Sequence, residues 1–316
     1  MQRDRSIDFL KGLCIVLVVY AHLPMDGAMH DMLHSLSGFI YTFHIQLFVM
    51  ITGYLFAHNI DSGFRGMTKV VNRMWKPYFV VAPLDLILYL SASFFGLKTT
   101  NTVTDLGSGI VKILLGNGGG ALWYLYTYGL LEILILVFGI VLFNIRDNRV
   151  RIIAQCILSS VFFYLLKVLG LDLFTSWIPF FFIGIAIGCS FDKFPRHMIC
   201  LFFAPIAYLL FQKMGETCLT MHFIWVLLLA FGVLDIADKI NYGTLGRAFV
   251  FMGKHSLVIL LFHPMITTLA RLFSNYVLEI EHTGILLSLI MLSVDIVCCI
   301  MIERVMRLLR IDKFVF

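Results

Sequence analysis

The chain has 316 residues, of which 60% are hydrophobic and only 14% charged, and its formal net charge at pH 7 is +5. Soluble domains carry about a quarter charged residues, so this composition excludes a soluble enzyme and predicts an integral membrane protein. The apolar runs are continuous, which excludes a barrel of strands with alternating polarity. Membrane topology explains the excess of basic charge without any nucleic-acid partner.

Long apolar runs follow one another along the chain, and each is close to the roughly 20 residues that cross a bilayer as a helix. They predict an all-α protein with about ten transmembrane helices, separated by short charged loops. The predicted spans are residues 7–24, 35–57, 77–97, 122–143, 152–171, 173–191, 197–212, 217–235, 249–271 and 284–307.

The distribution of basic residues predicts the orientation. If the N-terminus is cytoplasmic, all but five of the 24 lysines and arginines fall on the cytoplasmic side, as the positive-inside rule requires. The sequence therefore predicts that both termini are cytoplasmic and that residues 1–316 form a single membrane domain. The five exceptions are Lys98, Lys112, Lys167, Lys213 and Arg271.

One segment between the second and third predicted spans has a different character. Basic residues recur there at helical spacing and oppose apolar ones, which predicts an amphipathic helix in the inner interface, ended by Pro77. Such a helix is either a lipid anchor or a source of cations for an anionic cytoplasmic ligand. The basic residues are Arg65, Lys69, Arg73 and Lys76, and the apolar ones Met67, Val70, Val71 and Met74.

Ionisable residues at membrane depth are costly unless they are paired or face a wet cavity. Lys11 and His22 are eleven residues apart, which places them within about 20° of one helix face and roughly 16 Å apart along it. This line suits an extended ligand with an anionic head and a reactive tail, although a snorkelling lysine and an incidental histidine give the same pattern. The full set is Lys11, His22, His44, Asp85, Glu132, His222, His263 and Asp295.

Two further histidines, His44 and His263, are predicted at similar depth in the outer half of the membrane. They come from separate helices and lack a His-x-x-x-His spacing, so we expect no metal site. Polar packing between helices is one explanation for each of them. Catalysis is the other, because an imidazole titrates near neutral pH and is a natural general base.

Four motifs make the chain similar to a known family. The segment from Asp4 to Leu13, with His22 eleven residues after Lys11, resembles the first-helix signature of the membrane-bound acyltransferase-3 family. Three further motifs match in order along nearly the whole chain, with Gln46, Thr52 and His255 departing from the usual spelling. They are Phe43–Phe48 with Thr52–Phe56, then Ala121–Leu125, then Gly253–Leu257 with Phe262–Pro264.

The resemblance implies transfer of an acyl group, usually acetyl, from acyl-coenzyme A to a hydroxyl of a carbohydrate or lipid-linked glycan. The compact chain looks most like a fucose acetylase. The family's distribution implies a multi-pass protein of the bacterial inner membrane. Membrane lipid and the glycan acceptor are the expected partners, and a homodimer is left open.

The resemblance also implies roles for individual residues. His22 is expected to be the catalytic base, with an acyl-histidine intermediate as the rival route. Lys11, together with Arg73 or Lys76, is expected to bind the coenzyme A phosphates. The residues expected around the reacting groups are His44, His263, Glu132 and Trp123, the last as a contact of the donor.

Some residues have a second interpretation. Glu132 is equally a satisfied core carboxylate or an orienting partner for a histidine, and Asp85 and Asp295 are interpreted as structural. The glycine-rich loop at about 98–121 is expected to contribute to the acceptor site.

Two other classes of function stay open. A glycan-lipid transporter or flippase would also place ionisable residues in a wet cavity, but it would bind no coenzyme A. A non-catalytic sensor or scaffold would keep the motifs without turnover.

Overall fold

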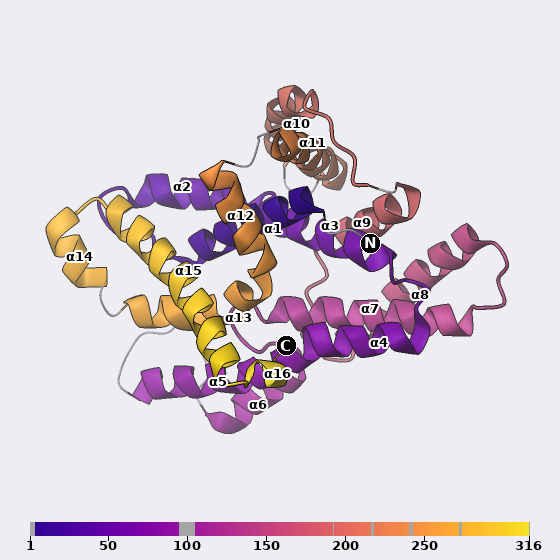
Figure 1. The fold of residues 1–316 in the computed structure, drawn as a ribbon, viewed down its shortest axis with the longest axis horizontal. Helices are drawn as coiled ribbons and strands as arrows, with labels where there is room; N and C mark the ends of the chain where they lie inside the picture. Colours follow the sequence, from indigo (N-terminus) through magenta and orange to yellow (C-terminus); the bar gives the residue numbers. More distant parts are fainter. Residues whose placement is uncertain are drawn as a thin grey trace. The chain divides into compact units, whose positions relative to one another are not determined.

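The computed structural model describes residues 4–94, 105–191, 193–215, 218–239, 243–271 and 274–315 (Figure 1). Within these ranges every regular element is a helix, which agrees with the predicted all-α class. Arg3, Lys98 and residues 98–104 of the predicted acceptor loop lie outside the described residues.

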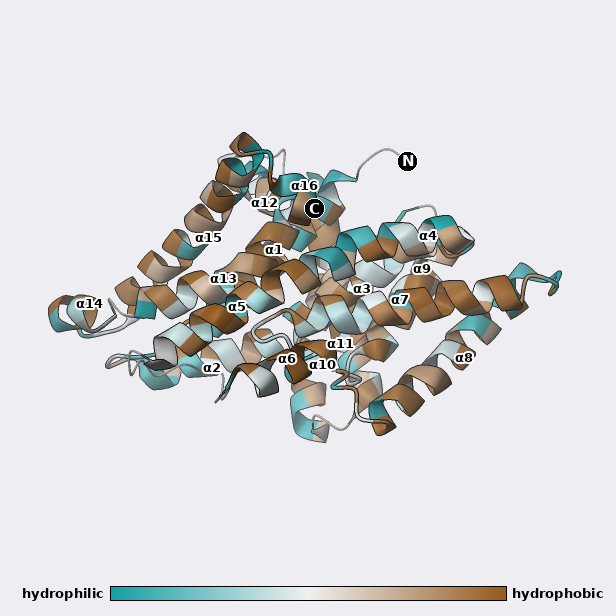
Figure 2. Cartoon of the chain, turned by 90° about the horizontal axis from the view of Figure 1, so that it is seen from below, coloured by the Kyte–Doolittle hydropathy of each residue, from teal (hydrophilic) through white to brown (hydrophobic). Residues whose placement is uncertain are grey.

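The described helices confirm a multi-pass membrane protein. Five of them are long and apolar enough to cross a membrane, or six if one bent pair forms a single span. Hydrophobic stretches are plain along α1 (Arg5–His22) and α7 (Trp123–Val141) in Figure 2. The exact count of ten spans and the side of the termini stay predictions. The five candidates are His30–Ala57, Trp123–Val141, Asn148–Val168, Leu219–Lys239 and Ile285–Leu308.

Two predicted spans are interrupted. The segment predicted as one span at residues 249–271 is not one straight helix, because α12 (Thr244–Lys254) and α13 (Ser256–Ala270) meet at 84°. The His255 N–H donates to the carbonyls of Phe251 and Met252, which closes the last turn of α12. The predicted span 35–57 lies within the candidate span His30–Ala57, in which a turn at Thr42 and Phe43 separates α2 (His30–Tyr41) from α3 (His44–Ala57).

The chain divides into two compact units, and the first comprises Met1–Ala57, Trp177–Leu260 and Leu269–Ile300. In this unit α1 packs against α12 and α3, and α3 packs against α9. The helices of this unit not yet given are α9 (Ile178–Ser190), α10 (Cys200–Met214), α11 (Leu219–Lys239), α14 (Ser274–Glu281) and most of α15 (Ile285–Leu308).

Glycines bring pairs of these helices into backbone contact. A Cβ added at Gly253 of α12 would lie 1.7 Å from the Asp8 carbonyl oxygen of α1, and one at Gly12 would lie 1.9 Å from the Phe249 oxygen. Only glycine permits such an approach. The α3–α9 pair uses the same device through a Gly-x-x-x-Gly pattern, Gly184 and Gly188, which is typical of close helix packing in membranes.

The second unit comprises His58–Ser176, Leu261–Thr268 and Met301–Phe316. In it α4 and α8 pack against α7, and α6 and α16 pack against α5. Part of α13 and the end of α15 also belong here. The remaining helices of this unit are α4 (Gly63–Val70), η1 (Val71–Trp75), α5 (Lys76–Phe94), α6 (Leu106–Leu114), α8 (Asn148–Val168) and α16 (Asp312–Val315).

The amphipathic segment does not end at Pro77 as predicted. It runs from α4 through the π-helical turn η1 directly into α5. A proline inside an α-helix clashes with the carbonyl four residues earlier, and the wider π-helical turn before Pro77 relieves that clash. Arg65 and Lys69 are exposed, whereas Val70 and Met74 are buried.

Gly253→Ala tests the α1–α12 contact. The added methyl group meets the Asp8 carbonyl at 1.7 Å, so the helices must separate at an overpacking cost of about 1–3 kcal/mol. We expect the thermal midpoint of the detergent-purified protein to fall by about 5 °C or more. The matched control is Gly38→Ala in α2, where nothing lies within 4 Å of the added carbon. Equal midpoints for the two variants would contradict the contact.

Candidate active site

His22 is the last residue of α1, and its ring is fixed by its own helix. Its Nδ1 lies 2.7 Å from the Val18 carbonyl oxygen. A carbonyl only accepts hydrogen bonds, so Nδ1 carries the proton and donates it. In the neutral ring Nε2 then holds the lone pair, which is the form that a general base or a nucleophile requires.

His44, the first residue of α3, repeats this arrangement. Its side chain is fully buried, its Nδ1 lies 2.7 Å from the Ile40 oxygen, and Tyr41 packs edge-on against its ring at 5.0 Å. Within the described part of the chain its Nε2 is buried without a hydrogen-bond partner. His22 and His44 are also close enough for the charge of one ring to act on the other. The first unit therefore brings two of the predicted site residues together.

Lys11 lies on the same unbroken helix as His22, as the spacing predicts. It is half-buried. It lies about one helical turn after Asp8, which is buried. Because Gly12 touches the backbone of α12, the position of Lys11 is set by helix packing as well as by its own helix.

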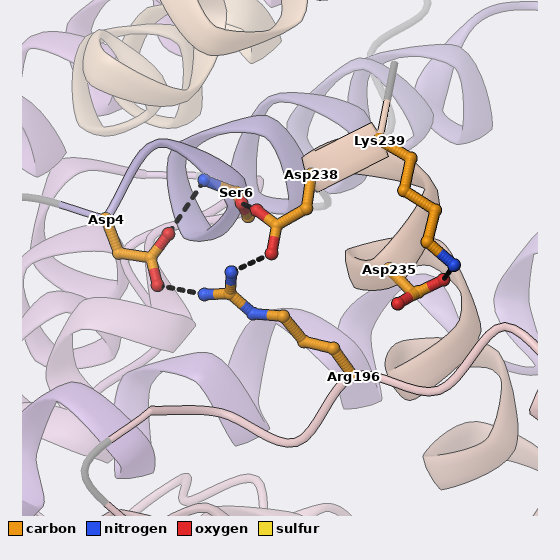
Figure 3. A network of polar contacts seen from close by, with 6 residues as sticks. All are labelled: Asp4, Ser6, Arg196, Asp235, Asp238 and Lys239. Atoms are coloured by element: carbon orange, nitrogen blue, oxygen red, sulfur yellow. Dashed lines mark hydrogen bonds and ion pairs between the residues drawn. The ribbon is translucent and has the colours of Figure 1, made fainter. Parts of the chain in front are cut away.

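A polar network holds the N-terminal end of α1 (Figure 3). Arg196, from the segment between α9 and α10, pairs with Asp4 and with Asp238 at the end of α11. Ser6 donates its hydroxyl to Asp238, and its backbone N–H donates to Asp4 at 2.9 Å. Burial lowers the pKa of Arg196, but the bonds and charges of the two carboxylates outweigh it and raise that pKa overall.

In the second unit Arg73 and Glu132 form an ion pair. The Arg73 guanidinium, in η1, donates to Glu132 Oε2 on α7 at 2.5 Å. Glu132 is fully buried, whereas the Arg73 side chain is 44% exposed. Glu132 therefore orients a predicted phosphate-binding cation. Arg73 keeps donors on its exposed side, since a guanidinium has five N–H groups.

The other predicted donor contacts also lie in this unit. Lys76, the first residue of α5, donates to the Lys313 carbonyl at 2.5 Å. Trp123 begins α7, is half-buried, and packs against Phe174 with ring centroids 4.8 Å apart.

The glycine loop before α7 lies against α5 and α13. A Cβ on Gly120 would touch Pro264 at 2.8 Å and would lie 3.9 Å from Asp85 Oδ2. Asp85 is buried, and neither of its oxygens has a hydrogen-bond partner among the described residues. His263, next to Pro264, is fully buried. Within the second unit these contacts bring the glycine loop before α7 close to Asp85 and to Pro264, the residue after His263.

The described residues contain no group of three or more His, Cys, Asp or Glu side chains able to hold a metal ion.

Fold and site together define a multi-pass helical membrane protein with buried histidines and basic residues on its helices. The chain belongs to the acyltransferase-3 family, because the family model, described as an acyltransferase domain, matches residues 4–304. This confirms the resemblance seen in the motifs.

One curated relative is similar over part of its length. Nodulation protein NolL of Mesorhizobium japonicum is 31% identical over 142 residues, which cover 43% of this chain and 36% of the relative. No solved structure matches the chain.

Two residues of the polar network could not be recognised as partners from the sequence. Arg196 is one of many basic residues predicted on the cytoplasmic side, and Asp238 lies in a mixed run of acidic and basic residues at the end of α11. The pattern Asp-x-Ser at Asp4 and Ser6 is a signal for a helix start, but it does not reveal the distant arginine.

Arg196→Gln tests this network. Removing the cation leaves the Asp4 and Asp238 carboxylates facing one another, so we expect the thermal midpoint to fall by about 2–4 °C. Adding Asp238→Asn should restore part of the loss, because it removes one of the two like charges.

Arg247→Gln is the control for the loss of one basic residue, since Arg247 is exposed on α12, and it should leave the midpoint unchanged. Additive effects of Arg196→Gln and Asp238→Asn would contradict the network.

Proposed function

We propose that the protein transfers an acyl group, with acetyl as the expected one, from cytoplasmic acyl-coenzyme A to a hydroxyl of a carbohydrate or lipid-linked glycan. The proposed location is the bacterial inner membrane. The observation that carries the proposal is the contact between His22 Nδ1 and the Val18 carbonyl, because it leaves Nε2 as a proton acceptor.

In the proposed reaction neutral His22 accepts the proton of the acceptor hydroxyl at Nε2 as the hydroxyl oxygen attacks the thioester carbonyl. A tetrahedral intermediate forms, its carbon–sulfur bond breaks, and the ester and the coenzyme A thiolate separate. The imidazolium then returns its proton to the thiolate, so the base is regenerated. General-base catalysis of this kind contributes about 10²–10⁴-fold in rate.

His44 is proposed as a second imidazole beside His22. Its Nε2 is buried and has no hydrogen-bond partner among the described residues, so it is available to a hydroxyl or to a carbonyl oxygen. His263, which is fully buried, is proposed as a further catalytic residue.

The proposed contacts with the acyl donor are mainly basic side chains. Lys11 is proposed to bind the coenzyme A phosphates. Arg73, through its exposed side, and Lys76, three residues later, are the other proposed phosphate contacts. Glu132 supports this by holding the Arg73 side chain, and Trp123 offers an aromatic face.

A glycan-lipid transporter or a non-catalytic family member is the alternative. Such a protein would keep the helices and the histidines but would turn over no thioester. The acyltransferase family match favours catalysis.

The test is binding and turnover of radiolabelled acetyl-coenzyme A by detergent-purified protein. We expect His22→Ala to bind the donor as wild type does but to lose at least about 100-fold in acetyl transfer or hydrolysis. Lys11→Ala should weaken donor binding. His222→Ala is the control, because the His222 ring already bonds the Thr42 carbonyl within the helix bundle.

Two outcomes of this experiment would contradict the proposal. A wild-type protein with no affinity for acetyl-coenzyme A or longer acyl donors would favour a transporter. A His22→Ala variant with full turnover would remove His22 from the reaction. Labelled acetyl trapped on His22 would instead support the acyl-histidine route.

A further inference from the structure

The π-helical turn η1 faces α7 through a tryptophan as well as through Arg73. The Trp75 indole stacks on Tyr126 with centroids 6.0 Å apart and planes 19° from parallel. It also lies directly over Gly129, where an added Cβ would meet the indole Cδ1 and Nε1 at 2.8 Å. The glycine thus lets the indole lie against the α7 backbone. Single π-helical turns within helices are frequent at functional sites.

Two buried polar atoms at this face have no hydrogen-bond partner within the described residues. One is the Trp75 Nε1–H, which only donates, and the other is Glu132 Oε1, which accepts in the carboxylate paired with Arg73. Buried polar groups in proteins are nearly always satisfied, so each such atom needs an explanation. Among the described residues, one donor and one acceptor at this face therefore lack a hydrogen-bond partner.

The α7 positions that carry these two atoms, Gly129 under the indole and Glu132, are about one helical turn apart. Trp75 Nε1 is over Gly129, and Glu132 is three residues further along α7. Residues at this spacing are neighbours on one helix face, with Cβ atoms about 5–6 Å apart. The face therefore offers one donor and one acceptor to a single small group.

A secondary amide matches this pair, because it is planar and directs its N–H and its C=O to opposite sides. Arg73 lies two residues before Trp75 and is the proposed phosphate-binding cation. A ligand with phosphates followed by amides is coenzyme A, whose pantetheine arm carries two secondary amides. A sugar hydroxyl would also fill both positions, but it does not account for the adjacent cation.

We propose that Trp75 and Glu132 bind an amide of the pantetheine arm of acyl-coenzyme A, with the indole N–H donating to the amide oxygen and Glu132 Oε1 accepting the amide N–H. This inference rests on the proposed function, since it assumes that acyl-coenzyme A is the donor. Its consequence is that donor recognition includes the arm as well as the phosphates.

The test compares two donors, acetyl-coenzyme A and S-acetylpantetheine, which keeps both amides but lacks the nucleotide. We expect Trp75→Phe to weaken binding of both by the same factor, about tenfold for the loss of one buried hydrogen bond. Lys11→Ala should weaken acetyl-coenzyme A only. Trp225→Phe is the matched control, because its indole already donates to Thr42 at 3.3 Å.

A second variant separates the hydrogen bond from the packing. Replacing Trp75 with benzothienylalanine keeps the shape of the side chain and removes only the N–H, and it should weaken both donors as Trp75→Phe does. Unchanged affinity for both donors in this variant would overturn the inference. A loss confined to acetyl-coenzyme A would also overturn it, because the indole would then act on the nucleotide. If wild type binds neither donor, the proposed function itself fails.

Discussion

Backbone contact between helices is the constraint on which this structure depends. Gly12 and Gly253 let α1 and α12 approach until the carbonyls of Asp8 and Phe249 occupy the space of a side chain. In a membrane the hydrophobic effect does not drive helices together, so close packing of small residues has to stabilise their association. The same glycines belong to the sequence motifs of the family. They therefore fix the helix that carries Lys11 and His22, and their role in the motifs is structural.

The class of fold could be predicted from the sequence, because continuous apolar runs and few charges leave only helices in a membrane. The breaks within helices could not. Nothing in hydropathy distinguishes the 84° bend at His255 from a straight span, and Pro77 indicates a helix end where a π-helical turn carries the helix on. Hydropathy records how apolar a segment is, whereas bends are set by hydrogen bonds to particular carbonyls such as those of Phe251 and Met252.

The site was predictable where it is local in sequence. Lys11 and His22 share one helix, and the spacing alone indicates this. The histidine tautomer also depends on local geometry, since His22 and His44 each donate to the carbonyl four residues earlier. Partners distant in sequence were not predictable. Glu132 was expected as a satisfied core carboxylate or as a partner of a histidine. It is buried, but its partner, Arg73, is 59 residues away in the sequence and could not be predicted, because tertiary packing brings η1 onto α7.

The central claim is that acyl transfer takes place at His22, and the most direct test is a cryo-electron microscopy map of the protein with acetonyl-coenzyme A, a donor analogue that cannot be cleaved. The account predicts the carbonyl of the analogue beside His22 Nε2, with the phosphates at Lys11. Density that places the carbonyl away from both His22 and His44, or that shows no bound analogue at saturating concentration, would contradict it.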